Sequence, residues 1–332
     1  MDFLPILWFV LIAVLWVGYL FLEGFDLGVG MLMTTFARGN RERRLLLNTI
    51  GPVWDGNEVW LITAIGATFA AFPLWYGSLL SSLYLPFFIV LLGLIFRAVA
   101  FEYRGKVDQP RWRAVADLAI AIGSFVASFG IGVVLGTTTT GLPVNGHGDR
   151  VGGAFAWFSW PAMLGGVAVV SFALIHACAF VTLKSTGEVR HRARALVVRW
   201  VIPAGLPLLA WVLLVQIRSG SWLSWLSFVV AALALCGVWL AARGNREGWA
   251  FLGLGSYLVA AIGSLFGACF PVVLPSTLDS AFDLTVTNAS SSPYTLGLMS
   301  VVAAFGIPLV LAYQGWTYWV FRKRISLASI PV

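Results

Sequence analysis

Nine long apolar runs dominate this chain and leave little room for any fold other than a membrane-embedded helical bundle. Each run has close to the ~20 residues that an α-helix needs to cross a hydrocarbon core of about 30 Å. The runs lie near 3–22 or 3–36, 54–72, 79–101, 114–137, 160–183, 198–217, 221–242, 250–271 and 297–321. Hydrophobic residues make up 60% of the chain and charged residues only 11%, too few for a solvated exterior. We therefore predict an all-α polytopic membrane protein with nine transmembrane helices.

The basic residues predict how these helices are oriented. Nearly all of the 21 Lys and Arg residues lie in the connections after the first, third, fifth, seventh and ninth runs. Arg150 and Arg218 are the exceptions in the opposite connections, and Arg97 lies inside the third run. The positive-inside rule then places the N-terminus outside and the C-terminus in the cytoplasm. The net charge of +7 thus reflects topology and attraction to anionic lipid, and nothing in it indicates nucleic acid as a partner.

The connections predict one transmembrane domain over residues 1–332. Apart from the outer segments 138–159 and 272–296 they are short, and no linker separates soluble domains. The fourth and eighth runs share the short sequence Ala-Ile-Gly-Ser, at 121–124 and 261–264.

This shared sequence is open to two interpretations. It is compatible with a pseudo-repeat of helices 1–4 (about 3–137) and 5–8 (about 160–271), followed by helix 9 at about 297–321. Chance explains it equally well, because small residues are favoured wherever membrane helices pack closely.

Two pairs of acids are the strongest functional candidates. Glu23 and Asp26 lie in the first helix, and Asp55 and Glu58 open the second. Each pair has i, i+3 spacing and so shares a helix face, in what the predicted orientation makes the cytoplasmic half. Ionisable residues inside a membrane are expensive to bury and are functional candidates by default. We expect a polar seam that can relay protons.

A structural interpretation of the same acids stays open. Asp55 and Glu58 would then stabilise the N-terminus of the second helix through its dipole, while Glu23 and Asp26 would pair with Arg97 or reach toward the membrane surface.

Three other charged residues have simpler predicted roles. Asp117 lies four residues after Arg113, so we expect a local ion pair between them. Glu102 and Arg104 are expected to anchor the third helix at the membrane interface.

Histidine and cysteine offer no ligand set for a metal or haem. His176 is the one histidine inside an apolar run, and we predict a hydrogen-bonded core residue. Cys178, Cys236 and Cys269 lie in separate runs without a Cys-x-x-Cys pair, so we interpret them as small core side chains. Gly24, Gly28 and Gly30 fit close helix packing better than a nucleotide-binding turn.

Three blocks of sequence resemble a known family. They read Gly-Phe-Asp-Leu-Gly-Val-Gly-Met at 24–31, Trp-Asp-Gly-Asn-Glu-Val-Trp-Leu-Ile-Thr-Ala at 54–64 and Phe-Arg-Ala-Val-Ala-Phe-Glu-Tyr-Arg at 96–104. Blocks of this kind, in this order, are similar to those of subunit II of the cytochrome bd quinol oxidases. The resemblance spans most of the chain and is weakest over 200–250, where many relatives have a longer outer connection.

The resemblance implies a fold of two four-helix bundles plus one peripheral helix, in a bacterial cell membrane. It also implies an obligate partner, a homologous subunit I that holds two b haems and haem d. The complex would couple quinol oxidation to reduction of dioxygen to water, taking protons from the cytoplasm. Subunit II would bind no haem and no metal. A structural quinone or lipid in this subunit and a small accessory subunit are left open.

The resemblance also assigns roles to residues. Asp55 matches a carboxylate that lines a proton channel toward the oxygen site, and Trp54, Asn57 and Glu58 would continue its lining. A second polar route or the subunit contact would involve the remaining three polar residues, Glu23, Asp26 and Arg97.

Two alternative functions compete with this one. A proton-coupled transporter would also carry intramembrane acids, but it should have broken helices around a polar site at the membrane midplane. A purely structural scaffold for the haem subunit would have the same acids in satisfied ion pairs. The scaffold predicts that neutralising Asp55 leaves turnover intact.

Overall fold

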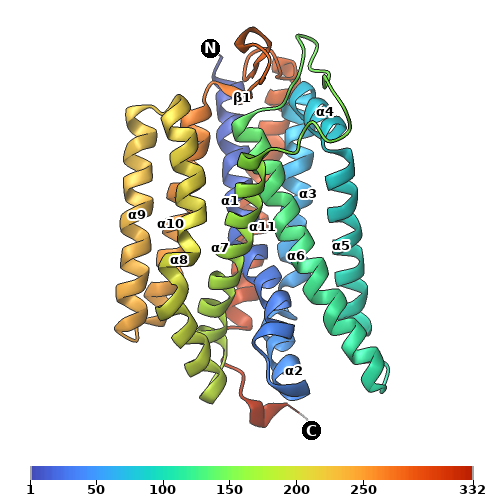
Figure 1. The fold of residues 1–332 in the computed structure, drawn as a ribbon, viewed down its shortest axis with the longest axis vertical. Helices are drawn as coiled ribbons and strands as arrows, with labels where there is room; N and C mark the ends of the chain where they lie inside the picture. Colours follow the sequence, from blue (N-terminus) through green and yellow to red (C-terminus); the bar gives the residue numbers. More distant parts are fainter. Residues whose placement is uncertain (1, 331–332) are drawn as a thin grey trace.

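The computed structural model describes residues 2–330, which form a bundle of helices capped by one short two-stranded sheet (Figure 1). The helices are α1 (Phe3–Thr35), α2 (Gly39–Ile50), α3 (Trp54–Ala71), α4 (Pro73–Ser82), α5 (Tyr84–Tyr103), α6 (Pro110–Thr140), α7 (Trp160–Lys184), α8 (Gly187–Ser219), α9 (Trp222–Arg243), α10 (Glu247–Cys269) and α11 (Pro293–Val320). Strands β1 (Val272–Leu274) and β2 (Leu284–Thr285) pair antiparallel. Within the described residues, eight helices are long and apolar enough to cross a membrane, which confirms an all-α polytopic membrane protein.

The ninth expected span is present as a helix but is less apolar than the others. α3 covers nearly all of the predicted range 54–72. Its first five residues include Asp55, Asn57 and Glu58, and these lower its mean hydropathy. α3 is therefore absent from the eight candidate spans found in residues 2–330. The count of nine spans therefore stays a prediction.

Several helices begin earlier than their apolar runs predict. α8 begins at Gly187, although its apolar run starts near 198. The extra turns carry Glu, Ala and Arg, which are good helix formers, so the backbone stays helical beyond the membrane-buried part. Apolar runs predict the membrane-buried part of a helix and not its ends.

A proline interrupts the helix between α3 and α4. Phe72 has φ −135° and ψ 70°, outside the helical region, because the ring of Pro73 disfavours helical geometry in the residue before it. Pro73 itself then starts α4, where its missing N–H costs nothing. Figure 1 shows α4 at the end of the molecule where the N-terminus lies.

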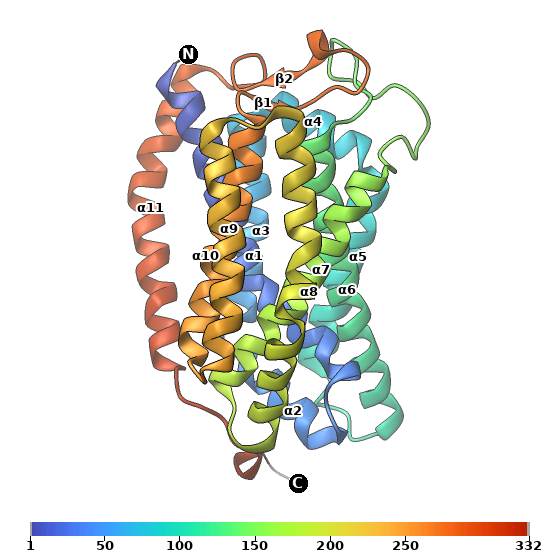
Figure 2. The same ribbon diagram turned by 60° about the vertical axis from the view of Figure 1, so that its left-hand side comes forward.

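α1 is the central helix of the bundle. It packs against α3, α6, α7 and α10, and from Phe25 to Met33 it is buried on all sides. In Figure 1, α3, α5 and α6 lie on one side of it and α8–α10 on the other. α11 stands at the periphery (Figure 2). In α11, Leu296 is the one buried residue within the described range.

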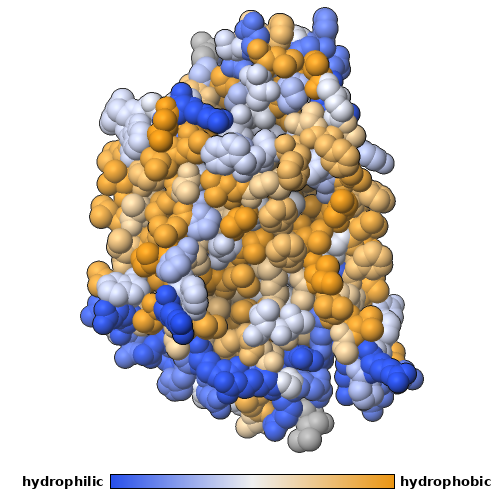
Figure 3. Space-filling view, in the orientation of Figure 1, coloured by the Kyte–Doolittle hydropathy of each residue, from blue (hydrophilic) through white to orange (hydrophobic). Residues whose placement is uncertain are grey.

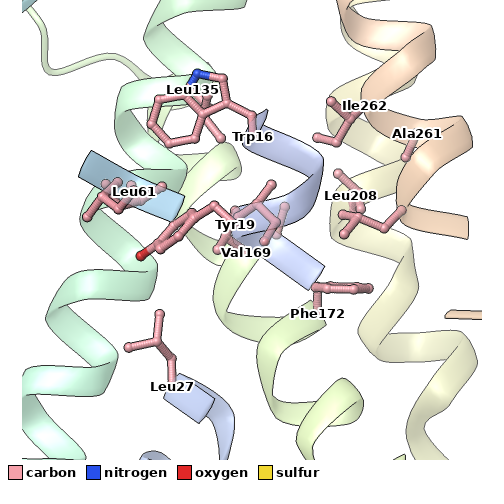
Figure 4. Packing of buried hydrophobic residues seen from close by; sticks show 14 of the residues in the cluster. Trp16, Tyr19, Leu27, Leu61, Leu135, Val169, Phe172, Leu208, Ala261 and Ile262 are labelled. Carbon is pink, nitrogen blue, oxygen red and sulfur yellow. The ribbon is translucent and has the colours of Figure 1, made fainter. Parts of the chain in front are cut away.

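Glycines bring α1 close to its neighbours. A Cβ at Gly28 would collide with the backbone carbonyl of Ala173 in α7, and one at Gly30 with the hydroxyl of Ser124 in α6. These contacts confirm the close-packing interpretation for both glycines. A Cβ at Gly24 would make only ordinary contacts, 3.7 Å from Phe172. Figure 4 shows the apolar core around α1, with side chains from α3, α6, α7, α8 and α10.

One end of the bundle is strongly basic; it carries α2, the α5–α6 and α9–α10 connections and the C-terminal segment. Figure 3 shows this end as a hydrophilic band below a largely apolar belt. We call it the basic end. α2 lies there with its leucines buried under α1. Ion pairs tie the segments together: Arg192 binds Glu42 at 2.9 Å, and Arg190 and Arg324 both bind Glu247, at 2.8 and 3.0 Å.

The predicted partner of Asp117 is wrong. Arg113 instead pairs with Asp108, while Asp117 binds Arg104 at 2.5 Å and Arg43 at 3.0 Å. Arg104 is 4% exposed, so it is not an interfacial anchor. The chain turns back between α5 and α6, which brings Arg104 onto the buried face of α6, and this non-local pair outcompetes the local one.

The Glu42 carboxylate should make the stability of the basic end depend on pH. Burial by itself would raise its pKa, but hydrogen bonds from the Arg192 side chain and the Arg38 backbone N–H outweigh burial and hold the pKa below its usual value. A lowered folded-state pKa means that the stabilisation is complete above the unfolded pKa and is lost as pH falls through the folded one.

We therefore expect Glu42→Gln to lower the melting temperature of the purified complex at pH 7, with a cost of about 1.5–3 kcal/mol. The difference from the parent protein should shrink as pH is lowered below the ordinary glutamate range. Thermal unfolding, monitored by light scattering at several pH values, measures the difference in melting temperature between the variant and the parent protein. Glu188→Gln is the matched control, since its side chain is 68% exposed, and equal effects of both variants would contradict the assignment.

Candidate functional site

The acid pair of α1 lies deep inside the bundle, against a single cation. Glu23 and Asp26 are 0% exposed and Arg97 of α5 is 1% exposed. Arg97 Nη1 lies 3.0 Å from Glu23 Oε1 and 3.3 Å from Glu58 Oε2 of α3. Glu23 lies roughly 18 Å along α1 from its last residue, Thr35, nearer to the basic end than to the opposite one. Three helices thus contribute to one ionic cluster.

Asn57 links this cluster to α11. Its amide nitrogen donates to Asp26 Oδ2 at 2.6 Å and to the Leu22 carbonyl at 3.3 Å. Its amide oxygen accepts hydrogen bonds from Gln314 and from the Tyr318 hydroxyl, both at 2.9 Å. Asn57 is 0% exposed, so every polar atom of its side chain has a partner, as a buried amide requires.

Aromatic side chains close the cluster on two sides. The Trp54 ring is buried, lies 4.9 Å from the ring of Phe101 and has the Arg97 guanidinium 5.8 Å from its centroid. On the other side Trp60 donates its indole N–H to Gln314 Oε1 at 2.8 Å. The polar groups are therefore enclosed between α1, α3, α5 and α11.

Asp55 lies outside this enclosure. It is in the first turn of α3 and is exposed, and no hydrogen bond or ion pair joins its side chain to another residue in the range 2–330. Glu58, one turn further on, is 22% exposed at its side chain and reaches inward to Arg97. The two acids therefore lead from the surface of α3 to the buried cluster.

Several buried atoms of the cluster lack a partner in good hydrogen-bond geometry among the described residues: the Tyr19 hydroxyl, the Glu23 carboxyl oxygens, Asp26 Oδ1 and Arg97 Nη2. Glu23 is still held by its ion pair to Arg97 and lies beside the Asp26 carboxyl group. Three carboxyl groups, those of Glu23, Asp26 and Glu58, face one guanidinium. Uncompensated buried charge is costly, so three carboxyl groups beside one guanidinium form a cluster that can hold protons as well as an ion pair.

Sequence reasoning missed three members of this site: Tyr19, Gln314 and Tyr318. All three are neutral polar side chains, whereas the candidates predicted from the apolar runs are charged ones. Gln314 carries the signal that could have found it, because an amide inside an apolar helix also needs a partner. No local pattern joins α11 to α3, however, since 257 positions separate Gln314 from Asn57.

The histidine and most of the cysteines behave as core residues. His176 is 0% exposed and its Nε2 lies 2.9 Å from the Phe21 carbonyl, which confirms the prediction. Cys178 is buried and Cys269 partly buried, but Cys236 is exposed on α9, so the core interpretation is wrong for Cys236. Within residues 2–330 no group of three or more His, Cys, Asp or Glu side chains could hold a metal ion.

Comparison with known proteins decides the family. Residues 4–321 match the family described as cytochrome bd terminal oxidase subunit II. The chain belongs to this family. It is 42% identical over 325 residues to cytochrome bd ubiquinol oxidase subunit 2 of Bacillus subtilis, with 96% of each chain covered. It is 34% identical over 369 residues to cytochrome bd-I ubiquinol oxidase subunit 2 of Escherichia coli K12, covering 99% of this chain and 97% of the relative.

A solved structure shares the fold of the family member described here. The bd oxidase from Geobacillus thermodenitrificans superimposes with a TM-score of 0.79 at 20% identity, covering 96% of this chain and 99% of that one. The chain is thus a multi-pass membrane subunit of a terminal oxidase, an oxidoreductase of the respiratory chain, and the resemblance drawn from the three sequence blocks is confirmed.

Proposed function

We propose that this chain is the haem-free subunit II of a quinol-oxidising bd-type oxidase and that it lines a proton-uptake path from the cytoplasm toward the oxygen-reducing site. The observation that carries the proposal is the buried cluster of Glu23, Asp26, Glu58 and Arg97, which connects through α3 to an exposed carboxylate. In this proposal the nine helices, α3 included, cross a bacterial plasma membrane with the basic end in the cytoplasm.

The path begins at Asp55 and runs inward along α3. Asp55 collects protons at the exposed first turn, Trp54 forms one wall, and Glu58 passes protons to the cluster. Asn57 holds Asp26 in place by its 2.6 Å hydrogen bond. Glu23, Asp26 and Arg97 form the inner part, either as a second polar route or at the contact with subunit I.

The face formed by α5, α3 and α11 is where we place subunit I. Large apolar residues cover it, such as Ile62 at 70%, Phe96 at 61% and Phe305 at 78% exposed. Apolar residues alone would suit lipid, but the exposed Asp55 and the partly exposed Glu58 would not, because carboxylates facing lipid are expensive. A protein partner at this face accommodates both, and it places the proton path at the subunit boundary.

The redox centres of the complex, two b haems and haem d, are assigned here to subunit I. His176 does not fit as an axial haem ligand, because its Nε2 is held by the Phe21 carbonyl and Phe172 and Phe251 stack on its ring at centroid distances of 5.0 and 4.8 Å. A structural quinone or lipid would fit the cavity of about 1,090 Å³ between α1, α3, α9, α10 and α11.

Two glycines offer a matched test of the partner face. Gly66 of α3 and Gly237 of α9 are both exposed, and a Cβ at either would meet nothing within 4 Å. Gly66→Trp should therefore leave this subunit folded but place a bulky ring against subunit I. We expect at least a fivefold loss of co-purified haem, judged from the absorption spectrum of affinity-purified complex. Gly237→Trp should co-purify haem normally, and the reverse pattern would move the interface to the α9 face.

A further inference from the structure

A second, smaller cavity at the basic end has the chemistry of a lipid-binding site. It has a volume of about 430 Å³, within the range of small-molecule pockets. Its walls are aromatic, with Phe25, Phe180 and Phe251 from the bundle and Tyr318 from α11. Two basic side chains also line it: Lys184 at the end of α7 and Arg322 just after α11. No acidic side chain is among its lining residues.

Neither cation is neutralised by a carboxylate of the described residues. No ion pair joins Lys184 or Arg322 to a carboxylate within residues 2–330. Lys184 Nζ donates to the carbonyls of Phe321 and Lys323, which leaves one of its three donors free. Arg322 gives one hydrogen bond to the Trp319 carbonyl at 2.5 Å and stacks on that ring at 4.5 Å, so most of its five donors remain.

The position of α11 also favours an occupant. Apart from Leu296, none of its described residues is buried, so direct contact with the bundle is slight. This cavity and the larger one both lie against the inner side of α11. Phe21, Leu22 and Tyr318 line both of them. A ligand that fills the space would contribute contacts that the polypeptide itself does not make.

We propose that this cavity binds an anionic glycerophospholipid, with one acyl chain among Phe25, Phe180 and Phe251 and the phosphate between Lys184 and Arg322. A free phosphate would gain nothing from the aromatic walls. A zwitterionic lipid would bring a cation toward two unpaired cations. Basic pockets between membrane helices at the cytoplasmic side are suited to anionic headgroups.

The test uses the purified two-subunit complex, exchanged into vesicles of equimolar phosphatidylglycerol and phosphatidylcholine with the same chains. Native mass spectrometry counts the lipids that stay bound. Each Lys or Arg near an anionic headgroup contributes roughly a fivefold gain in affinity. We therefore expect the parent complex to retain phosphatidylglycerol preferentially, and the double variant Lys184→Gln with Arg322→Gln to bind it about 25-fold more weakly.

Two controls separate this site from general charge loss. Arg243→Gln removes an arginine that also stacks on a tryptophan, Trp239, at the basic end, but it does not line the cavity, so lipid retention should be unchanged. Arg322→Lys keeps the charge and should retain most of the lipid. If the double variant fails to assemble, Arg322→Gln alone should still show the fivefold loss. Equal retention of both lipids, or equal loss in Arg243→Gln, overturns the proposal.

Discussion

Replacing Asp55 by Asn should reduce quinol-driven oxygen consumption roughly tenfold or more while the haem spectrum stays intact. An amide cannot take up and release a proton, and a missing acid–base group in proton transfer typically costs about 10²–10⁴-fold in rate. The fold should tolerate the change, because the Asp55 side chain is exposed and makes no hydrogen bond or ion pair within the described chain. Oxygen uptake by the purified two-subunit complex, with its absorption spectrum recorded, is the measurement.

The controls for Asp55 decide between a proton path and a scaffold. Asp108→Asn removes another acid at the basic end, 91% exposed at its side chain, and should leave turnover unchanged. Asp55→Glu keeps a carboxylate and should preserve much of the activity. Full turnover in Asp55→Asn with intact haems would mean that subunit II is a scaffold and that protons enter elsewhere.

Replacing Arg97 by Leu should abolish assembly rather than merely slow turnover. Arg97 is 1% exposed and is the one guanidinium within 4 Å of Glu23 and Glu58 in the described structure. Its loss leaves two carboxyl groups without their cation inside the bundle. Breaking one side of a buried ion pair costs about 3–5 kcal/mol, a large share of the stability of a typical domain. We expect less than a tenth of the parental yield of haem-bearing complex from membranes.

A double variant makes the Arg97 prediction specific. Glu23→Gln removes one of the two unpaired charges, so Arg97→Leu combined with Glu23→Gln should recover part of the yield, as expected for coupled residues in contact. Arg97→Lys should not substitute fully, because a lysine side chain ends one bond short of the position of Arg97 Nη1, the atom that contacts both Glu23 and Glu58. Normal assembly of Arg97→Leu alone would show that the three carboxyl groups are held neutral without it.

The Arg97 cluster illustrates what local patterns can and cannot predict. The i, i+3 spacing of Glu23 with Asp26 follows from helix geometry and could be predicted. That Arg97 would lie 3.0 Å from Glu23 could only be listed among the alternatives, since 74 residues separate them in the chain. The error at Asp117 has the same origin, because the predicted partner Arg113 is local and the true partners Arg104 and Arg43 are brought in by the fold.

The sequence by itself determined the class of this protein. Long apolar runs must become helices in a bilayer, since each backbone polar group there needs a partner within its own segment, and three motif blocks were specific enough to indicate the family. The tertiary structure alone decided which polar groups meet. It buried Glu23 and Asp26, left Asp55 at the surface and brought Gln314 and Tyr318 of α11 onto Asn57. Side-chain contacts between helices depend on how whole helices pack against each other, and no local pattern carries that information.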